Sequence, residues 1–489
     1  MRVAFVISGA ILAGAALTPP LAAATATHPD LAVVQISADP YSNAKAQHAT
    51  EVEPDTVTVG HTVMSVFQVG RWDNGCSDDI GWAVSTDSGR NWRHGYLPGL
   101  TRFSHPAGPF VRASDPAVAY DAAAGAWIVS SLACNGTSAN PNARVPSPAV
   151  EVNVSFDGVH WSKVIVAARI KKGQDFDKEW VTCDNSTASR FYGRCYMEWD
   201  VDNRNDLVQM ITSRDGGFHW SPAVSTSTRL DATGGEPVVQ PNGDVVVPIE
   251  SRNGLVAFRS VNGGRTWGPA AKIAAVFQHL FEGNLRGPFF ASVAIDRTGR
   301  IYVSWPDCRF RPSCASNDMV LSTSADGVHW TPVTRIPIDP VTSSVDHLGG
   351  GLGVDPGTSG GHARLALFYN FYPHTGCTVS SCRLYVGYVS STDGGAHWSA
   401  PQVIAGPMRL HQLAFAFGFM VGDYEGTAVV PGGNAVSAFA VGGIPAAGQR
   451  LSEAMYQPSG GAPITGGSRA ASPAGAHTST PAGLPGVTR

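Results

Sequence analysis

The chain has 489 residues, and its 34 Lys and Arg against 38 Asp and Glu give a formal net charge of −4. This balance excludes a nucleic-acid binder that relies on a basic surface. Charged residues make up only 15% of the chain, while 55 glycines and 34 prolines are spread along it. Such a composition favours short elements joined by tight turns and excludes coiled coils and helical bundles. The length fits two or three ordinary domains or one large repetitive β architecture, and the repeats described below favour the second.

The first residues have the pattern of a secretory signal peptide. Met1 and Arg2 precede an apolar run over residues 3–17, and the small residues 22–26 offer A-x-A cleavage sites near Ala24 or Ala26. The apolar run is shorter than the roughly 20 residues that a membrane span needs. We therefore expect a signal peptide over residues 1–26 and a secreted, extracellular mature protein without a membrane span.

Eight cysteines then lie in an oxidising compartment, where disulfides are expected. Six of them form close pairs along the chain, which predicts three local bonds: Cys183–Cys195, Cys308–Cys314 and Cys377–Cys382. By elimination the fourth bond joins Cys76 and Cys134. No C-x-x-C or nearby histidine has the spacing of zinc ligands, and no cofactor motif is present, so neither a metal nor a cofactor is predicted.

One short pattern occurs six times, and its tryptophans are 47 to 69 residues apart. An Asp or Asn whose side chain folds back onto the backbone, a Gly with positive φ and a Trp beneath the turn together predict a hairpin turn with a structural role. The six copies are STDSGRNW (85–92), SFDGVHW (155–161), SRDGGFHW (213–220), SVNGGRTW (260–267), SADGVHW (324–330) and STDGGAHW (391–398).

This pattern, S-x-D-x-G-x-x-W, resembles the Asp-box, or bacterial neuraminidase repeat, of sialidases and related secreted β-propellers. The six copies span residues 85–398, most of the mature chain. The resemblance implies an all-β fold, a β-propeller of four-stranded antiparallel blades in which the repeat joins the third strand to the fourth. Propellers with this repeat have many functions, so the resemblance is more specific for fold than for activity.

A seventh blade without the repeat is predicted over residues 422–440, followed by a third strand at 451–457. Residues 31–37 supply its missing outer strand and close the ring by joining the two ends of the chain. We therefore expect seven blades over residues 27–457, with six blades, the number in sialidases, as the alternative. Residues 458–489 are rich in Gly, Pro, Ser, Thr and Ala and are predicted to be a disordered tail.

In such a blade the repeats lie on one face of the propeller, so the innermost strands begin on the other, where ligands are expected. The predicted ligand is a carbohydrate or glycoconjugate, and no oligomeric state is indicated. Acidic and phenolic residues begin these strands: Glu53, Asp55, Asp115, Glu179, Glu236, Asp423, Tyr424 and Glu425.

The resemblance to sialidases assigns roles to some of these residues. Tyr424 in GDYEG is similar to the family's nucleophile, which as a neutral phenol approaches an anionic sugar without repulsion. Glu236 resembles the Glu that activates this tyrosine, and Arg252, 16 residues later, resembles a substrate-carboxylate ligand. Arg383 corresponds to a further arginine, and Asp115 is the candidate acid/base residue.

The chain departs from the family's arginine pattern. Arg112 in RASDP is the nearest candidate for the first arginine, but it lies four residues before the proline instead of two. Arg286 and Arg309 are alternatives chosen by position. Without three arginines that converge on one point, a site for a sialic acid carboxylate is not established.

Three functions remain open. The first is an exported, sialidase-like exo-glycoside hydrolase that acts on an acidic sugar and in which Glu236 and Tyr424 lie within hydrogen-bond reach. The second is a noncatalytic propeller that binds glycan or protein at the same position. The third is a polysaccharide lyase, with His347 or Tyr372 as its base.

The loop DVDNRNDL (200–207) has oxygen ligands at alternate positions, but Arg204 interrupts them, so a polar loop is favoured over a calcium site.

Overall fold

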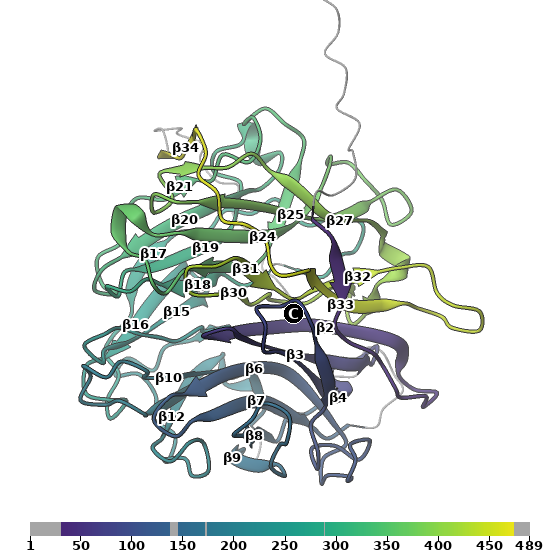
Figure 1. The fold of residues 1–489 in the computed structure, drawn as a ribbon, viewed down its shortest axis with the longest axis vertical. Coiled ribbons are helices and arrows are strands. Elements are labelled where there is room, and N and C mark those ends of the chain that lie inside the picture. The colour runs from purple at the N-terminus through teal and green to yellow at the C-terminus, as the bar shows by residue number, and fades with distance from the viewer. Residues whose placement is uncertain (1–30, 137–144, 172–173, 288, 474–489) are drawn as a thin grey trace, which may run out of the picture.

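A computed structural model describes residues 31–136, 145–171, 174–287 and 289–473. This part of the chain is all-β: it contains antiparallel strands and four short 3₁₀ segments (Figure 1). The 3₁₀ segments are η1 (Asp202–Arg204), η2 (Pro312–Cys314), η3 (Gly360–His362) and η4 (Leu410–Gln412). The described residues include no helix that is long and apolar enough to span a membrane. The signal peptide predicted over residues 1–26 lies outside them.

The strands follow one another in antiparallel groups, each built from consecutive segments of the chain. The first group contains β2 (Gln47–Val59), β3 (Thr62–Arg71), β4 (Ser77–Ser85) and β5 (Arg93–Tyr96). The second contains β6 (Arg112–Asp121), β7 (Ala126–Cys134), β8 (Ala149–Ser155) and β9 (Ile165–Arg169). The third contains β10 (Phe176–Cys183), β11 (Cys195–Val201) and β12 (Leu207–Ser213).

Further groups of the same kind complete the described chain. The fourth contains β13 (Ala232–Thr233), β14 (Val238–Val239), β15 (Val245–Ser251), β16 (Gly254–Ser260) and β17 (Ala271–Ala274). The fifth contains β18 (Ser292–Ile295), β19 (Ile301–Asp307), β20 (Asp318–Ser324) and β21 (Thr334–Arg335). The sixth contains β22 (Asp346–Gly349), β23 (Leu352–Val354), β24 (Leu365–Tyr372), β25 (Arg383–Ser391) and β27 (Gln402–Arg409).

The last group joins the two ends of the described chain. It consists of two paired sets: β30 (Thr427–Val429) pairs with β31 (Ala435–Ser437), and β33 (Glu453–Pro458) pairs with both β32 (Phe439–Gly442) and β1 (Val33–Gln35). Strand β1 pairs antiparallel with β33, and Figure 1 shows the purple β1 beside the yellow β33. The short pair β28 (Ala414–Phe415) and β29 (Phe419–Met420) lies between the sixth and last groups in sequence.

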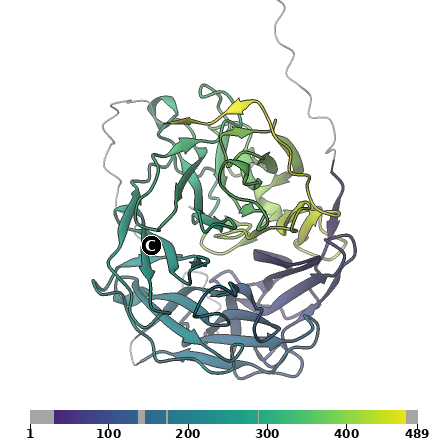
Figure 2. The same ribbon diagram turned by 60° about the vertical axis from the view of Figure 1, so that its left-hand side comes forward.

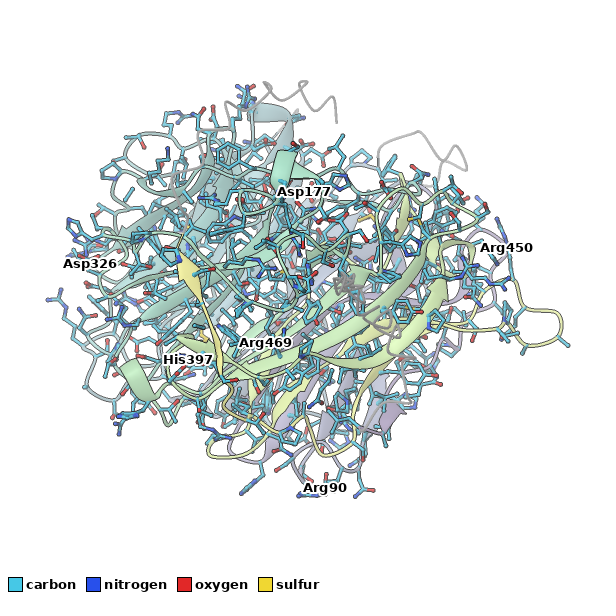
Figure 3. The ribbon with its side chains drawn as sticks, turned by 90° about the horizontal axis from the view of Figure 1, so that it is seen from above. Arg90, Asp177, Asp326, His397, Arg450 and Arg469 are labelled. Atoms are coloured by element: carbon cyan, nitrogen blue, oxygen red, sulfur yellow. A yellow bond between two sulfur atoms is a disulfide. The ribbon has the colours of Figure 1, made fainter. Side chains whose placement is uncertain are left out.

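The six repeat segments form the predicted hairpin turns. In the last copy, Ser391 Oγ donates to Asp393 Oδ1 at 2.9 Å, and the same Oδ1 accepts the amide of His397 at 2.9 Å. Gly394 has a φ of 73°, and Trp398 Nε1 donates to the Gly395 carbonyl at 3.0 Å. The local turn chemistry expected from the sequence is therefore confirmed. Figure 3 places Asp326 and His397, which belong to two different repeats, at the same margin of the molecule, opposite Arg450.

The hydrophobic core is divided into clusters, most of them shared by two successive groups. Val66 and Val118, for example, belong to one cluster between the first and second groups. The largest cluster connects the sixth and last groups to the first, with Phe368, Phe439 and Phe67 among its members. Each group thus buries apolar surface against the next, and Figure 2 shows the colours proceed around the molecule until the purple and yellow ends meet.

Residues 459–473, expected to belong to the disordered tail, instead pack against the strand groups. Ala462 forms a bridge with Ala435, and Ile464 is buried. Farther along, β34 (Arg469–Ala470) pairs with β26 (His397–Trp398), and β35 (Ser472–Pro473) pairs with β21. The segment is poor in apolar residues, but backbone pairing with free strand edges does not depend on side-chain type. The rest of the predicted tail lies outside the described residues.

All four predicted disulfides are present: Cys76–Cys134, Cys183–Cys195, Cys308–Cys314 and Cys377–Cys382. The bond between Cys76 and Cys134 connects the first strand group to the second.

The loop considered for calcium contains η1, whose Asp202 carbonyl accepts the amide of Asp206 at 3.4 Å.

Candidate functional site

Three successive inner strands contain the same irregularity. In β2, β6 and β10 the pairing register shifts at Glu53, Asp115 and Lys178, respectively. These residues have φ values of 56°, 48° and 52°, although none is a glycine. A left-handed conformation costs a non-glycine residue roughly 1–3 kcal/mol, and bulges of this kind redirect side chains beside functional sites. The repeated bulge therefore marks this position as a candidate site.

The three bulges direct their side chains to one ionic centre, which we define as Glu53, Asp115, Lys178, Arg286 and Asp423. Lys178 Nζ lies 2.7 Å from Asp423 Oδ2, 2.9 Å from Asp115 Oδ2 and 3.7 Å from Glu53 Oε1. Arg286 Nη2 approaches Asp423 Oδ2 from another side at 2.6 Å. The Lys178 side chain is only 8% exposed, so these contacts replace its water.

The ion pairs of this centre control its protonation. Burial by itself would raise the pKa of Asp115, but Lys178 and the Ser114 hydroxyl outweigh it, and the pKa lies below its usual range. Burial is likewise outweighed at Asp423, where Arg286 and Lys178 hold the pKa well below the ordinary value. Both aspartates are therefore ionised at neutral pH, and the carboxylates in turn raise the pKa of Lys178 against the effect of burial.

A small cavity that is partly open to solvent adjoins the ionic centre. Its walls combine aromatic rings, carboxyl groups and small residues from the third, fourth, fifth and last strand groups. The lining residues are Lys178, Glu179, Trp180, Gly234, Gly235, Glu236, Phe290, Ala291 and Tyr424. The predicted residues Glu236 and Tyr424, 188 positions apart in the sequence, are thus brought to the same cavity.

The Tyr424 hydroxyl donates its hydrogen bond to the Pro116 carbonyl of β6 at 3.0 Å, and not to Glu236. Its ring meets the Trp180 ring edge-on at a centroid distance of 5.0 Å, and Lys178 Nζ lies 5.9 Å from its centroid. Burial, followed by the charges of Glu53 and Asp115, raises the pKa of Tyr424 well above its usual value. The phenol is therefore neutral in the ligand-free site.

Two carboxyl groups of the cavity differ in their partners. Glu236 Oε2 accepts the backbone amide of Val293 at 2.9 Å, whereas neither oxygen of Glu179 accepts a hydrogen bond from another residue in the described part of the chain. Burial raises the pKa of both groups well above the ordinary value, with added repulsion from Asp55 at Glu236 and from Asp115 at Glu179. Burial therefore favours the protonated form of both carboxyl groups over the ionised form.

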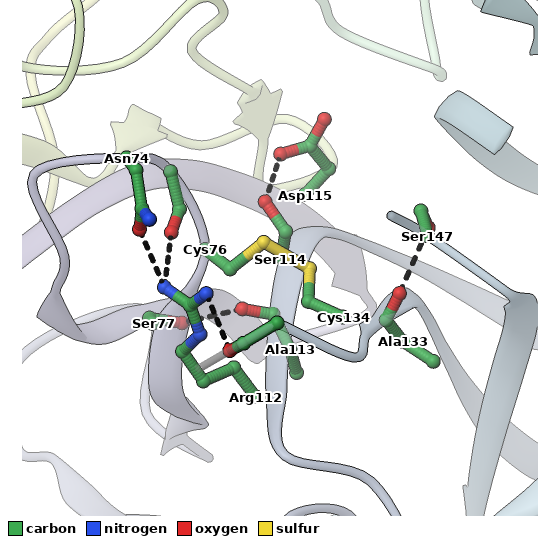
Figure 4. The surroundings of a disulfide bond; sticks show 12 residues. Asn74, Cys76, Ser77, Arg112, Ala113, Ser114, Asp115, Ala133, Cys134 and Ser147 are labelled. Atoms are coloured by element: carbon green, nitrogen blue, oxygen red, sulfur yellow. Dashed lines mark hydrogen bonds between the residues drawn. A yellow bond between two sulfur atoms is a disulfide. The ribbon is translucent and has the colours of Figure 1, made fainter. Parts of the chain in front are cut away.

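Asp115, predicted as the acid/base residue, does not line the cavity. Its Oδ1 accepts the Ser114 hydroxyl at 2.5 Å, as Figure 4 shows, and its Oδ2 faces Lys178. A carboxylate held in its charged form by a lysine has no proton to donate near neutral pH. Its position in the structure is that of a counter-ion to Lys178.

The predicted arginine clamp does not assemble among the described residues. Arg112 is buried and donates to Asn74 Oδ1 and to the carbonyls of Gly75 and Gly136, beside the Cys76–Cys134 disulfide (Figure 4). Arg309 pairs with Asp307 in its own loop at 2.7 Å.

The other two arginines are also held apart from the cavity. Arg383 donates to the nearby carbonyls of Ser380 and Cys382. Arg252 occupies the exposed two-residue turn between β15 and β16, because Ser251 already pairs with Gly254. Glu236 lies opposite Pro248, four residues before this turn, so Glu236 and Arg252 are not side by side. Of the five candidate arginines, Arg286 alone contacts the ionic centre.

The residues considered for a lyase lie elsewhere. His347 is fully buried, and its Nδ1 is 2.9 Å from the Asn317 carbonyl. Tyr372 is buried and donates to the Glu282 carbonyl at 3.3 Å. His347 also lies near Asp318 and Asp339, a grouping compatible in spacing with metal ligands. Arg311 and Arg335 each approach both carboxylates within 2.9 Å, so guanidinium groups occupy that position.

Lys178, Trp180 and Phe290 were not predicted as site residues. Lys178 lies in the segment DKEW of β10, whereas the equivalent segments of β2 and β6 are EPD and SDP. The lysine therefore has no motif in common with Glu53 and Asp115, and only its position in the inner strand indicated a role. Trp180 and Phe290 have no charge or motif and become recognisable only when the strand groups meet. The pairing of Lys178 with Asp423 spans 245 residues of the chain.

The protonated carboxyl groups predict how stability depends on pH. Burial raises the pKa of Glu51 and Glu425 to about 8 and that of Asp55 and Asp79 to about 7. Unfolded Glu and Asp lose their protons near pH 4, so from pH 5 to 8 the folded state binds more protons and its stability falls as pH rises.

We expect the free energy of unfolding, measured by urea titration of Trp fluorescence, to decrease by at least about 2 kcal/mol from pH 5.5 to pH 8. His347, whose pKa burial lowers, acts in the opposite direction, but only below about pH 6.5. Glu425→Gln, which keeps an acceptor for Asn370, should reduce the slope. A stability that is constant or rises over this range would contradict the prediction.

Fold and site together define an all-β protein with an ion-paired centre and an acidic, aromatic cavity beside it. No family model matches the chain, and no curated protein is similar to it in sequence. Among solved structures, a Hadza microbial sialidase is 14% identical, with a TM-score of 0.42 over 84% of this chain and 66% of that one.

Two further solved structures have comparable similarity. Trypanosoma rangeli sialidase, as a covalent intermediate with 2,3-difluorosialic acid, is 10% identical with a TM-score of 0.46, over 88% of this chain and 58% of that one. A protein of unknown function from Dyadobacter fermentans is 14% identical with a TM-score of 0.45, over 74% of this chain and 98% of that one.

Proposed function

We propose that this protein is a secreted, sialidase-like exo-glycoside hydrolase whose reaction takes place in the cavity between Tyr424 and Glu236. The observation that carries the proposal is that a neutral phenol, the carboxyl groups of Glu179 and Glu236 and the rings of Trp180 and Phe290 line one cavity. Aromatic faces pack against the apolar faces of sugar rings, and carboxyl groups perform acid and base catalysis.

The scaffold of this proposal is a seven-bladed β-propeller with Asp-box turns. The successive antiparallel groups, the clusters between them and the pairing of β1 with β33 support this interpretation. Because β1 joins the last group, the two ends of the chain close the proposed ring. The four disulfides are compatible with an extracellular location.

In the proposed reaction Tyr424 attacks the anomeric carbon and Glu236 accepts the phenolic proton. A base must be ionised: burial raises the pKa of Glu236, and the Val293 amide opposes this only in part, so the proposed reaction uses the ionised form of Glu236. The hydroxyl of Tyr424 must first turn away from the Pro116 carbonyl, a rotation about a single bond. For an acidic sugar, Lys178 and Arg286 are the cations beside the cavity, and both already contact Asp423.

A noncatalytic glycan-binding propeller is the second candidate. The hydrogen bond from Tyr424 to Pro116 and the separation of Arg112, Arg252 and Arg383 favour it, because neither is expected in an assembled sialidase site. Under this alternative the same aromatic cavity binds a sugar without cleaving it.

The test is release of 4-methylumbelliferone from a panel of acidic and neutral glycosides, including the sialic acid conjugate. Tyr424→Phe and Glu236→Gln should each lower kcat/KM by at least about a hundredfold, because each removes a group that takes part in bond making or proton transfer. Tyr192→Phe, which alters an exposed tyrosine outside the cavity, is the matched control.

A wild-type protein that releases nothing from any glycoside would refute the hydrolase. Saturable binding of a saccharide that Tyr424→Phe or Trp180→Ala weakens would then support the glycan-binding propeller. Full activity of both cavity variants would place the reaction elsewhere on the molecule.

A further inference from the structure

The cavity contains a carboxyl group with no assigned role. Glu179 lines the cavity, its residue is only 2% exposed, and neither of its oxygens accepts a hydrogen bond from another described residue. Buried polar groups of native proteins are nearly always paired, so an unpaired one that faces a cavity indicates a ligand as its partner. Burying it without a partner is costly, and this cost is retained where function needs the group.

The backbone holds Glu179 beside the proposed nucleophile. Glu179 lies in the β10 bulge between Lys178 and Trp180, since the register shifts between Asp177 and Trp180. Both flanking side chains contact the Tyr424 ring: Trp180 packs against its edge, and the Lys178 ammonium lies 5.9 Å from its centroid. The bulge therefore brings an unpaired carboxyl group close to the phenol, on strands that are held by the ionic centre.

We propose that Glu179 is the proton donor to the leaving group in the glycoside hydrolase reaction proposed above, and this inference rests on that proposed function. Asp115 does not fill this role, because Lys178 and Ser114 hold its oxygens and it is not part of the cavity wall. Glu236 accepts the amide of another residue, Val293, whereas only its own backbone amide and the charge of Lys178 favour the anion of Glu179. We therefore assign the base to Glu236, whose carboxyl group has a fixed donor from another residue, and the acid to Glu179, whose carboxyl group has none.

The proposed step conserves atoms and electrons. The bond between the anomeric carbon and the glycosidic oxygen breaks, its electron pair stays on that oxygen, and the oxygen takes the proton of Glu179. The Tyr424 oxygen bonds to the anomeric carbon, and its proton passes to Glu236. In the second step water gives its proton to Glu179 and bonds to the carbon, while the tyrosine oxygen leaves and recovers its proton from Glu236.

Burial and the neighbouring charges are consistent with a proton on Glu179. Burial and Asp115 raise its pKa well above the usual value, and Lys178 only partly offsets them. The other groups that face it are Asp177 on its own strand and Tyr424, which is neutral. The Lys178 charge is shared among the carboxylates of the ionic centre, which limits its effect on Glu179.

The experiment compares wild type and Glu179→Gln on two glycosides of one sugar, an activated 2,4-dinitrophenyl glycoside and an alkyl glycoside. A dinitrophenolate leaves without protonation, so we expect a loss of under about tenfold in the bond-breaking step for the first and of at least about a hundredfold for the second. The variant should also lose the basic limb of its pH profile, and azide should restore turnover by replacing the base-assisted water.

Glu151→Gln is the matched control, because Glu151 in β8 is equally buried, has no hydrogen-bond partner in the described chain and does not line the cavity. It should leave both rates unchanged. Independently of activity, the infrared difference spectrum of wild type minus Glu179→Gln at pH 7 should contain the stretch of a protonated carboxyl group.

The outcomes separate the two proposals. Equal losses on both glycosides, or no protonated carboxyl band at pH 7, would overturn the role of Glu179 while the hydrolase proposal stands. A wild-type protein that cleaves neither these nor any other glycoside would overturn both. A loss confined to the alkyl glycoside, with the control unaffected, supports Glu179 as the acid.

Discussion

Replacing Lys178 by Met is expected to lower the free energy of unfolding by about 3–5 kcal/mol at pH 7. The lysine is the shared partner of Asp115, Asp423 and Glu53, and its removal leaves Asp115 without an ion-pair partner and Asp423 with Arg286 alone. Methionine keeps an unbranched stem of similar length, so the change mainly removes the charge. Urea unfolding followed by Trp fluorescence measures the effect.

The loss should shrink toward pH 4, because protonation of the abandoned carboxylates removes the uncompensated charge. Lys272→Met, at an exposed lysine, should change stability by less than about 0.5 kcal/mol. If Lys178→Met is as stable as wild type at pH 7, the ionic centre is not a structural element of this fold. A loss that is the same at pH 4 and pH 7 would assign the effect to packing instead of charge.

Replacing Ile36 by Ala is expected to lower the free energy of unfolding by about 2–5 kcal/mol. Ile36 follows β1 and is 1% exposed, in the cluster that connects the sixth and last strand groups to the first. Its amide donates to the Met455 carbonyl at 2.9 Å, and the adjacent Ser37 hydroxyl accepts the Met455 amide at 2.8 Å. The N-terminal strand is thus anchored by side chain and backbone together.

Ile444→Ala is the control, because that isoleucine is 88% exposed and the same atoms are removed. It should leave the unfolding midpoint within experimental error. If Ile36→Ala were equally neutral, β1 would contribute nothing to joining the chain ends, and the proposed closure of the ring would lose its main support.

The repeat turns and the disulfides were predictable because their determinants are local or few. Each turn is closed by residues within about eight positions, such as Ser391, Asp393 and Trp398, and no distant group is needed. Three of the four cysteine pairs are at most 12 residues apart, so the fourth followed by elimination. The pairing of residues 31–37 with the C-terminal strand was also predicted, from the missing edge of the last group.

The site was only partly predictable, for the opposite reason. Glu236 and Tyr424 were predicted because they begin inner strands, and both line one cavity in the structure. Sequence spacing failed for Arg252, because a two-residue turn starts at Ser251 and leaves the arginine exposed. Sequence spacing also failed for Arg112, because its guanidinium group donates to the nearby carbonyls of Gly75 and Gly136 instead of lining the cavity.

Local sequence alone determined the turns, the all-β character and the residues that begin the inner strands, because neighbouring atoms along the chain decide these features. Only the tertiary structure decided that Lys178 meets Asp115 and Asp423 and that Glu179 faces a cavity without a partner. These outcomes depend on how far each bulge rotates a side chain and on which strands pack together. Burial and charge then change the protonation of the same residue types, which no spacing along the chain encodes.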